Sequence, residues 1–151
     1  MLFRSEVAPE LKFILLIPDF EVSTPVARKV LPDSIPRSGA VTSVANACRI
    51  TAAFFQRRYD LLRGCFADGL HQPFREPLVP LLPKAIAAGQ NAGALGGFLS
   101  GSGSTICCVT LGDPEAVASA MIELAPPGAH VVVTTADNAG VTLIEDEHGV
   151  S

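Results

Sequence analysis

The sequence predicts an α+β fold in which helices pack on one face of a mostly antiparallel sheet. Short apolar runs rich in β-branched residues lie near both ends of the chain, and the stretches between them have helical spacing. The segment 93–111, GALGGFLSGSGSTICCVTL, holds two such runs joined by a glycine-rich turn, which is the pattern of a β-hairpin. The order of strand, helices, two strands, helix and two strands is typical of helices on an antiparallel sheet.

The composition predicts one globular domain over residues 1–151. Apolar residues make up 48% of the 151 residues and charged residues 17%, which suits a chain with a substantial core. The net charge is −4 and basic runs are short, so a nucleic acid or an acidic membrane is not an expected partner. No apolar run approaches the roughly 20 residues of a membrane helix, and the start lacks a signal-peptide pattern. A cytoplasmic location is therefore expected.

The cysteine pattern argues against both a disulfide framework and a metal site. The sequence has four cysteines, and none of them forms a CxxC motif. If 106–111 is a strand, the adjacent Cys107 and Cys108 must point to opposite faces of the sheet. His130 and His148 have no second ligand at a suitable spacing, so no metal site is predicted. We expect reduced, mostly buried thiols.

The first strand and the first helix follow each other closely. The run LKFILLIP, Leu11–Pro18, reads as a buried strand. Thr24 is a good N-cap and Pro25 suits the first helical position, which predicts a helix to about Leu31. Thr24 and Arg28 are four residues apart and share one face of this helix. They could present a hydroxyl and a guanidinium to a ligand, or simply cap the helix and lie in solvent.

Three helices are expected in the middle of the chain, over residues 41–56, 60–69 and 81–91. The first of them carries one apolar stripe, of the kind that normally faces a core. The residues of this stripe are Val41, Val44, Ala45, Cys48, Ala52 and Phe55.

The segment His71–Leu78, HQPFREPL, contains two prolines four residues apart, which exclude a regular helix through it. His71, Gln72 and Arg75 lie together on this stiffened loop. The cluster could belong to a binding site, or it could be polar residues in an exposed connection.

The C-terminal third begins with the strands of the hairpin, 95–99 and 106–111. Asp113 and Pro114 then form a compact helix start, and the helix ends before Pro126. Its expected buried stripe is Val117, Ala120, Met121 and Leu124. Two strands, 130–135 and 140–144, and a polar tail, 145–151, complete the chain.

The glycine turn between the hairpin strands could hold an anion. Glycine tolerates positive φ, and successive amides in such a turn can form an anion-binding concavity. The turn Ser100–Ser104 lacks the lysine of a GxxxxGK[ST] phosphate loop. From this stretch alone, a tight hairpin without a ligand is equally plausible.

Three segments together resemble the C-terminal half of the homoserine kinase family, within the GHMP small-molecule kinase superfamily. IPDFEVSTPVARKVLP, Ile17–Pro32, is similar to a segment with an S-T-x-x-A-R pattern. LHQPFREPL, Leu70–Leu78, is similar to the H-x-P-[YF]-R segment, and GALGGFLSGSGST, Gly93–Thr105, to the third superfamily motif. This chain departs from the family at Ser102-Gly103-Ser104, where Ala-Gly-Pro is common. The three segments occur in the family's order and span nearly the whole chain.

The resemblance implies a transferase that phosphorylates the side-chain hydroxyl of L-homoserine with ATP, a step of threonine biosynthesis. It places Thr24 beside the transferred phosphate and the acceptor hydroxyl, as a catalytic residue. It assigns Arg28 and Arg75 to the carboxylate of the amino acid, with His71 nearby. Ser100, Gly101, Ser102 and Gly103 would lie against the phosphate loop for ATP and support it.

The resemblance also shows which parts of such a kinase this sequence lacks. The main phosphate loop, P-x-x-x-G-L-G-S-S, and the magnesium-binding Glu belong to the N-terminal half of the family, so ATP and Mg²⁺ are expected mainly through that half. A chain without it should expose an apolar face and self-associate, as a homo-oligomer. Two alternatives stay open: a non-catalytic binding or oligomerisation module of the same fold, and another GHMP kinase.

Overall fold

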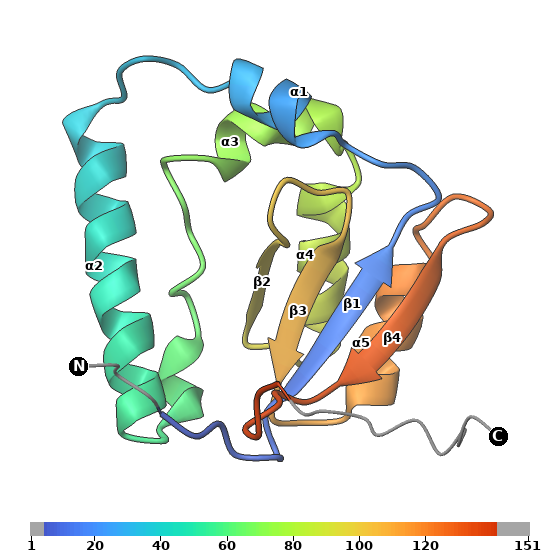
Figure 1. The fold of residues 1–151 in the computed structure, drawn as a ribbon. Helices are drawn as coiled ribbons and strands as arrows, with labels where there is room; N and C mark the ends of the chain where they lie inside the picture. Colours follow the sequence, from blue (N-terminus) through green and yellow to red (C-terminus); the bar gives the residue numbers. More distant parts are fainter. Residues whose placement is uncertain (1–4, 142–151) are drawn as a thin grey trace, which may run out of the picture.

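The computed structural model describes residues 5–141, which form a four-stranded antiparallel sheet with helices on it (Figure 1). The strands are β1 (Lys12–Ile17), β2 (Gly96–Leu99), β3 (Ile106–Thr110) and β4 (His130–Thr134), in the order β2-β3-β1-β4. The predicted fold class is confirmed, as are the first strand, the hairpin and the strand at 130. The strand expected at 140–144 falls largely, and the tail at 145–151 wholly, outside the described residues.

The helical elements, including two short 3₁₀ helices η1 and η2, occupy the connections between strands. Between β1 and β2 lie α1 (Thr24–Lys29), α2 (Arg37–Phe55), η1 (Tyr59–Leu62), α3 (Gln72–Arg75), η2 (Glu76–Leu78) and α4 (Leu82–Asn91). α5 (Pro114–Ile122) joins β3 to β4. None of the helices among residues 5–141 is both long and apolar enough to cross a bilayer.

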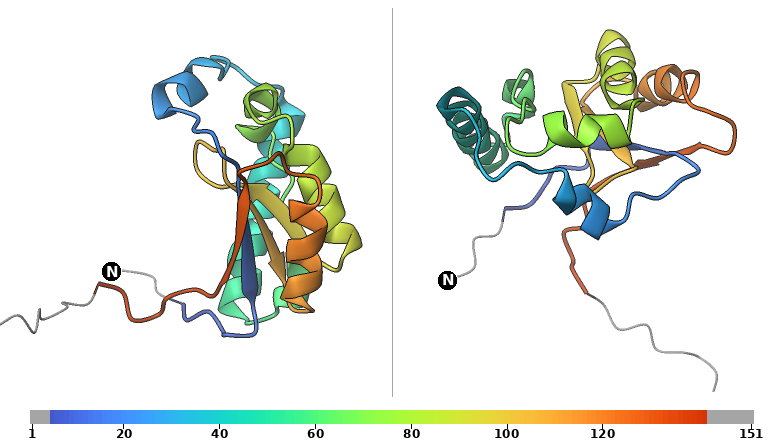
Figure 2. Two further views of the ribbon diagram at one scale, coloured as in Figure 1. Left: turned by 90° about the vertical axis from the view of Figure 1, so that its right-hand side faces the viewer. Right: turned by 90° about the horizontal axis from the view of Figure 1, so that it is seen from above.

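Helices α4 and α5 cover one face of the sheet, as the side view shows (Figure 2). Ile14, Leu16 and Ile106 are fully buried there, in one core with Val117 and Met121 of α5. α5 begins as predicted, because the Asp113 carboxylate accepts the N–H groups of Glu115 and Ala116. Its expected stripe is only partly right: Ala118 is buried, whereas Leu124 is exposed.

A second, smaller core lies on the opposite face, over β2 and β3. Ala53 of α2 packs there with Leu62 of η1, and Cys107 and Val109 of β3 join them. Cys107 therefore belongs to one core and Cys108 to the other, as strand alternation requires. The sequence did not predict this second layer, in which α2 stands beside the sheet as a wall (Figure 1).

The prediction that the apolar stripe of α2 faces the core is wrong, because the stripe faces away from the sheet. Val41, Val44 and Phe55 are 60%, 63% and 58% exposed. The side of α2 that faces the sheet instead carries Asn46 and Ala53, its two buried residues. Ile50 and Phe54 on this inward side pack against the second core. Nearer the start of α2 the inward side is small and polar, because the loop backbone at 67–69 packs against it there.

The segment 60–69 is not the predicted helix. The short helix η1 covers only Tyr59–Leu62, and Gly64 follows at φ 73°, outside the helical region. The prolines of 71–78 occupy early positions of two short helical turns, α3 and η2, so they start helices there rather than only interrupt one.

Ser23, rather than Thr24, is the N-cap of α1, and its side chain makes no capping hydrogen bond.

The four cysteines differ sharply in access: Cys48 is exposed, and Cys65, Cys107 and Cys108 are buried free thiols. Burial raises the pKa of Cys107 and Cys108 to about 12. Iodoacetamide at pH 8 should therefore alkylate one thiol per native chain and four in denaturant, counted by intact mass, since the thiolate is the nucleophile. Fast reaction of a second native thiol would contradict this packing.

Candidate active site

One arginine joins the three sequence segments on which the resemblance depends. Arg75, at the end of α3, donates from Nε to the carbonyl oxygen of Ala27 in α1 at 3.2 Å. Its Nη1 donates to the carbonyl oxygen of Gly101 at 2.9 Å. α1, α3 and the β2–β3 turn thus meet at one end of the sheet, where β1 ends (Figure 1). Segments up to 48 residues apart in sequence are linked by this one side chain.

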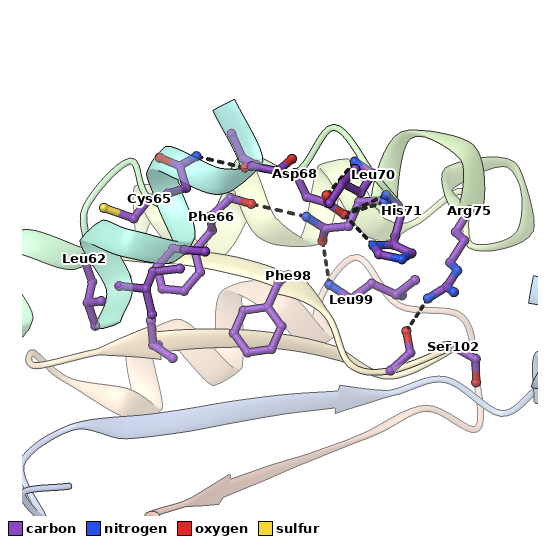
Figure 3. A pocket seen from close by; sticks show the side chains of 18 of the residues that line it. Leu62, Cys65, Phe66, Asp68, Leu70, His71, Arg75, Phe98, Leu99 and Ser102 are labelled. Atoms are coloured by element: carbon purple, nitrogen blue, oxygen red, sulfur yellow. Dashed lines mark hydrogen bonds and ion pairs between the residues drawn. The ribbon is translucent and has the colours of Figure 1, made fainter. Parts of the chain in front are cut away.

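These segments border a cavity of about 740 Å³ between α2 and the sheet, which we call the site cavity. Its polar end is lined by Thr24, Arg28, His71, Arg75, Gly101 and Ser102. Its apolar end is lined by Phe13, Ile50, Phe54, Leu62, Phe66, Phe98 and Val109. Figure 3 shows the contrast, with Leu62 and Phe66 at one side and Arg75 and Ser102 at the other.

The polar end favours an anionic group. Arg28 and Arg75 bring two permanent positive charges to it, and no hydrogen bond or ion pair among residues 5–141 engages the Arg28 side chain. Among the described residues that line the cavity, Asp68 is the only acidic one. Arginine suits this task because its planar fork of donors matches a carboxylate or phosphate.

Asp68 organises the backbone of α3. Its carboxylate accepts the N–H groups of Leu70, His71 and Gln72 at 2.7, 3.0 and 2.8 Å. Burial would raise the pKa of the Asp68 carboxyl, but these hydrogen bonds outweigh it and hold the pKa below its usual value. The His71 ring lies at 3.8 Å from the same carboxylate, at the cavity edge. Asp68 therefore holds the backbone that leads into α3, and with it the position of His71.

Gln72 joins α3 to the sheet through two hydrogen bonds of its side chain. Its Nε2 donates to the Phe66 carbonyl at 3.2 Å, and its Oε1 accepts the Leu99 N–H at 2.7 Å. Leu99 is the last residue of β2, directly before the glycine turn. The carboxamide thus fixes the distance between His71 and the turn.

The N-terminal half of α2 is attached by hydrogen bonds to the loop at 67–69. Ser43 Oγ accepts the Gly69 N–H and donates to the Gly39 carbonyl, both at 2.9 Å. Asn46 Nδ2 donates to the Ala67 carbonyl at 2.9 Å. A Cβ on Gly69 would lie 2.6 Å from the Cα of Gly39, so two glycine backbones touch here. This contact sets the width of the site cavity.

The structure brings six of the eight proposed site residues together. Thr24, Arg28, His71, Arg75, Gly101 and Ser102 all line the site cavity. Ser100 is exposed and does not line it, and Gly103 lines a separate hollow beside Asp19 and His130. Gly101 and Gly103 have φ of 60° and 94°, the positive values that the sequence suggested for this turn.

Sequence reasoning missed three of the polar residues that position this site, namely Ser43, Asn46 and Asp68. It named Gln72 in the cluster with His71 and Arg75, but not the contacts of Gln72 with Phe66 and Leu99. Gly39, Ser43 and Asn46 do have helical spacing, so they form a polar stripe opposite the apolar one. That stripe was the available signal. Asp68 and Gln72 act through backbone groups, which no side-chain pattern reveals.

Comparison with known proteins gives these residues a family context. The profile of the GHMP kinases C-terminal domain matches residues 50–126. The homoserine kinase of Aquifex aeolicus is 41% identical over 148 residues, which cover 95% of this chain and 50% of that enzyme. The homoserine kinase of Persephonella marina is 40% identical over 76% of this chain and 38% of its own length.

A solved structure agrees with the sequence comparison. The crystal structure of homoserine kinase from Cytophaga hutchinsonii matches with a TM-score of 0.81 and 28% identity, over 88% of this chain and 44% of that one. The chain thus spans about half the length of the relatives it matches. Because the matching profile covers half of the sequence, this chain belongs to the GHMP kinases, as a form of their C-terminal domain.

Proposed function

We propose that this chain is the substrate-side, C-terminal half of a homoserine kinase, which transfers the γ-phosphoryl group of ATP to the side-chain hydroxyl of L-homoserine. The observation that carries the proposal is the meeting of three distant segments at one cation-rich cavity end, held by Arg75. The named relatives at about 40% identity support the substrate.

The two arginines have different roles in this proposal. Arg75 uses two of its five N–H donors on the carbonyls of Ala27 and Gly101, so it both shapes the site and keeps donors for a ligand. Arg28 has no such partner among the described residues and offers its whole fork to the carboxylate of homoserine. Thr24, on the same face of α1, would hydrogen-bond the acceptor hydroxyl or the transferred phosphoryl group.

The residues of this chain do not fit the ATP and Mg²⁺ sites that such a kinase requires. Between residues 5 and 141 no group of three or more His, Cys, Asp or Glu could hold a metal ion. None of the residues from 5 to 141 that line the site cavity is a lysine, and the Gly101 carbonyl of the turn accepts a hydrogen bond from Arg75. Phosphoryl transfer depends on charge neutralisation by metal ions and cations. We assign both sites to the N-terminal half of the kinase.

The test compares the chain alone with a fusion to the half of the Aquifex aeolicus enzyme that lies outside its match. We expect no ATP-dependent phosphorylation of homoserine by the chain alone, because it lacks donor-phosphate chemistry, and measurable phosphorylation by the fusion. Phosphohomoserine formation is followed by mass spectrometry, with the Aquifex half alone as control.

Each other outcome has a distinct meaning. Turnover by the isolated chain would place a nucleotide site within it. A folded fusion that phosphorylates a different alcohol, such as mevalonate, would indicate another GHMP kinase, an alternative favoured by the large apolar end of the cavity. A folded fusion that phosphorylates nothing would support a non-catalytic module.

A further inference from the structure

The outward side of α2 is an apolar surface that no other part of residues 5–141 covers. We call it the outer face: Val41, Val44, Ala45, Cys48, Ala52 and Phe55, all exposed. Soluble proteins rarely leave a contiguous apolar patch of this kind bare unless it is an interaction site. The valines and the phenylalanine are more than half exposed, so they contribute little to the packing of this domain.

The outer face lies opposite the side of α2 that this domain uses. At 3.6 residues per turn, its centre is about 180° from the centre of the inward side, on which Ser43, Asn46 and Ala53 lie. The attachments of α2 to the loop at 67–69 all leave from that inward side. The outer face is therefore free to contact a partner without disturbing the site cavity.

The spacing and charge of the outer face indicate what kind of surface would bind it. Positions 41, 44, 48, 52 and 55 are separated by steps of three or four residues, which is the seam on which another helix packs. α2 contains Arg37 and Arg49 and no carboxylate, so a partner with acidic residues at its rim is complementary. Arg57 and Arg58, just beyond the helix, are already paired with Glu6 and Asp60.

We propose that the outer face is the surface on which the N-terminal half of the kinase docks, through an apolar helix with an acidic rim. This inference rests on the proposed function. Its support is that the chain covers only half of the Aquifex aeolicus relative and matches the profile of a C-terminal domain, so the relatives carry a further half of comparable size. A second copy of this chain is a poorer partner for the outer face. If two copies paired through this face, the arginines of one α2 would lie near those of the other, and neither helix has a carboxylate to pair with them.

Cys48 lies in the middle of the outer face, so its rate of alkylation shows whether a partner covers this surface. It is the exposed one of the four cysteines, so alkylation of native protein measures access to this surface. In the fusion with the Aquifex half we expect iodoacetamide to modify Cys48 at least about tenfold more slowly than in the chain alone, since a fused partner acts at millimolar effective concentration.

A matched pair of variants tests the surface itself. Val44→Asp places a charge on the outer face, and Thr42→Asp places the same charge at an exposed position on another side of the same helix. Val44→Asp should return Cys48 alkylation in the fusion to the rate of the chain alone, whereas Thr42→Asp should leave it within about twofold of the parent fusion. Both variants of the chain alone should melt like the parent, because neither side chain is buried.

The outcomes separate the surface from the activity. If the fusion phosphorylates homoserine while Cys48 reacts at the rate of the chain alone, the docking surface is wrong and the proposed function stands. If Cys48 becomes protected in the chain alone as its own concentration rises, the occupant is a second copy and the proposal is overturned. The proposal would also be overturned if Val44→Asp and Thr42→Asp both removed the protection of Cys48 in the fusion to the same extent.

Discussion

Lysine at position 75 is expected to raise the KM for homoserine about tenfold or more in the fused enzyme, with little change in the KM for ATP. Charge-assisted hydrogen bonds are worth about 1.5–3 kcal/mol, and about 1.4 kcal/mol corresponds to one factor of ten. Lysine keeps the charge but not the fork that reaches both the Ala27 and Gly101 carbonyls. Steady-state kinetics with each substrate varied in turn measures the effect.

Arg28 and Arg57 provide the comparisons for this result. Arg28→Lys should raise the KM for homoserine without lowering the melting temperature, because Arg28 holds no other described part of the fold. Arg75→Lys should raise the KM for homoserine and also lower the melting temperature, because Arg75 joins three segments of the fold. The double variant should lose less homoserine-binding free energy than the sum of the two single variants, because we propose that both side chains bind one carboxylate. Arg57→Lys, at an exposed ion pair, is the control. An unchanged KM in both single variants would remove the two arginines from the site.

Alanine at position 69 is expected to lower the free energy of unfolding by about 1–3 kcal/mol. Its Cβ would lie 2.6 Å from the Cα and 2.8 Å from the carbonyl oxygen of Gly39, so backbone must move. That movement also threatens the hydrogen bond between Gly69 and Ser43, which attaches α2. Urea denaturation followed by circular dichroism measures the loss.

Gly112→Ala is the matched control for this substitution. A Cβ at Gly112 would meet only Thr110 Oγ1, at an ordinary 3.5 Å. Its stability should stay close to that of the parent. If Gly69→Ala is as stable as Gly112→Ala, the close approach of α2 to the loop at 69 does not define the wall of the cavity.

Local signals in the sequence predicted the strands and the start of α5, because alternation and capping act over a few residues. Cys107 and Cys108 fell on opposite faces for this reason. The orientation of α2 could not be predicted in the same way. The apolar stripe shows which side of α2 is suited to burial. The sequence of one domain does not show whether the surface that buries it belongs to the same domain or to a partner.

The candidate site could be proposed from the sequence where side chains lie in recognisable segments, and not where backbone groups make the contacts. Thr24, Arg28, His71 and Arg75 were proposed because they lie in segments that resemble the homoserine kinase family, and the structure places all four in the lining of one cavity. Gln72 binds the backbone of Phe66 and Leu99, which are 6 and 27 residues away. Contacts of that kind depend on the fold as a whole, so they become visible only in three dimensions.

The central position of β1 in the sheet has a consequence for synthesis on the ribosome. Leu15 lies opposite Cys107 on one side and Val132 on the other, about 90 and 120 residues further along the chain. Among the four strands, the most apolar one is therefore synthesised before its neighbours, and about 90 further residues must follow before β3 can pair with it. Such distant pairing slows folding and leaves the nascent strand open to aggregation. A chaperone that binds the exposed strand would protect it during that time, so co-expression of a chaperone should raise the soluble yield.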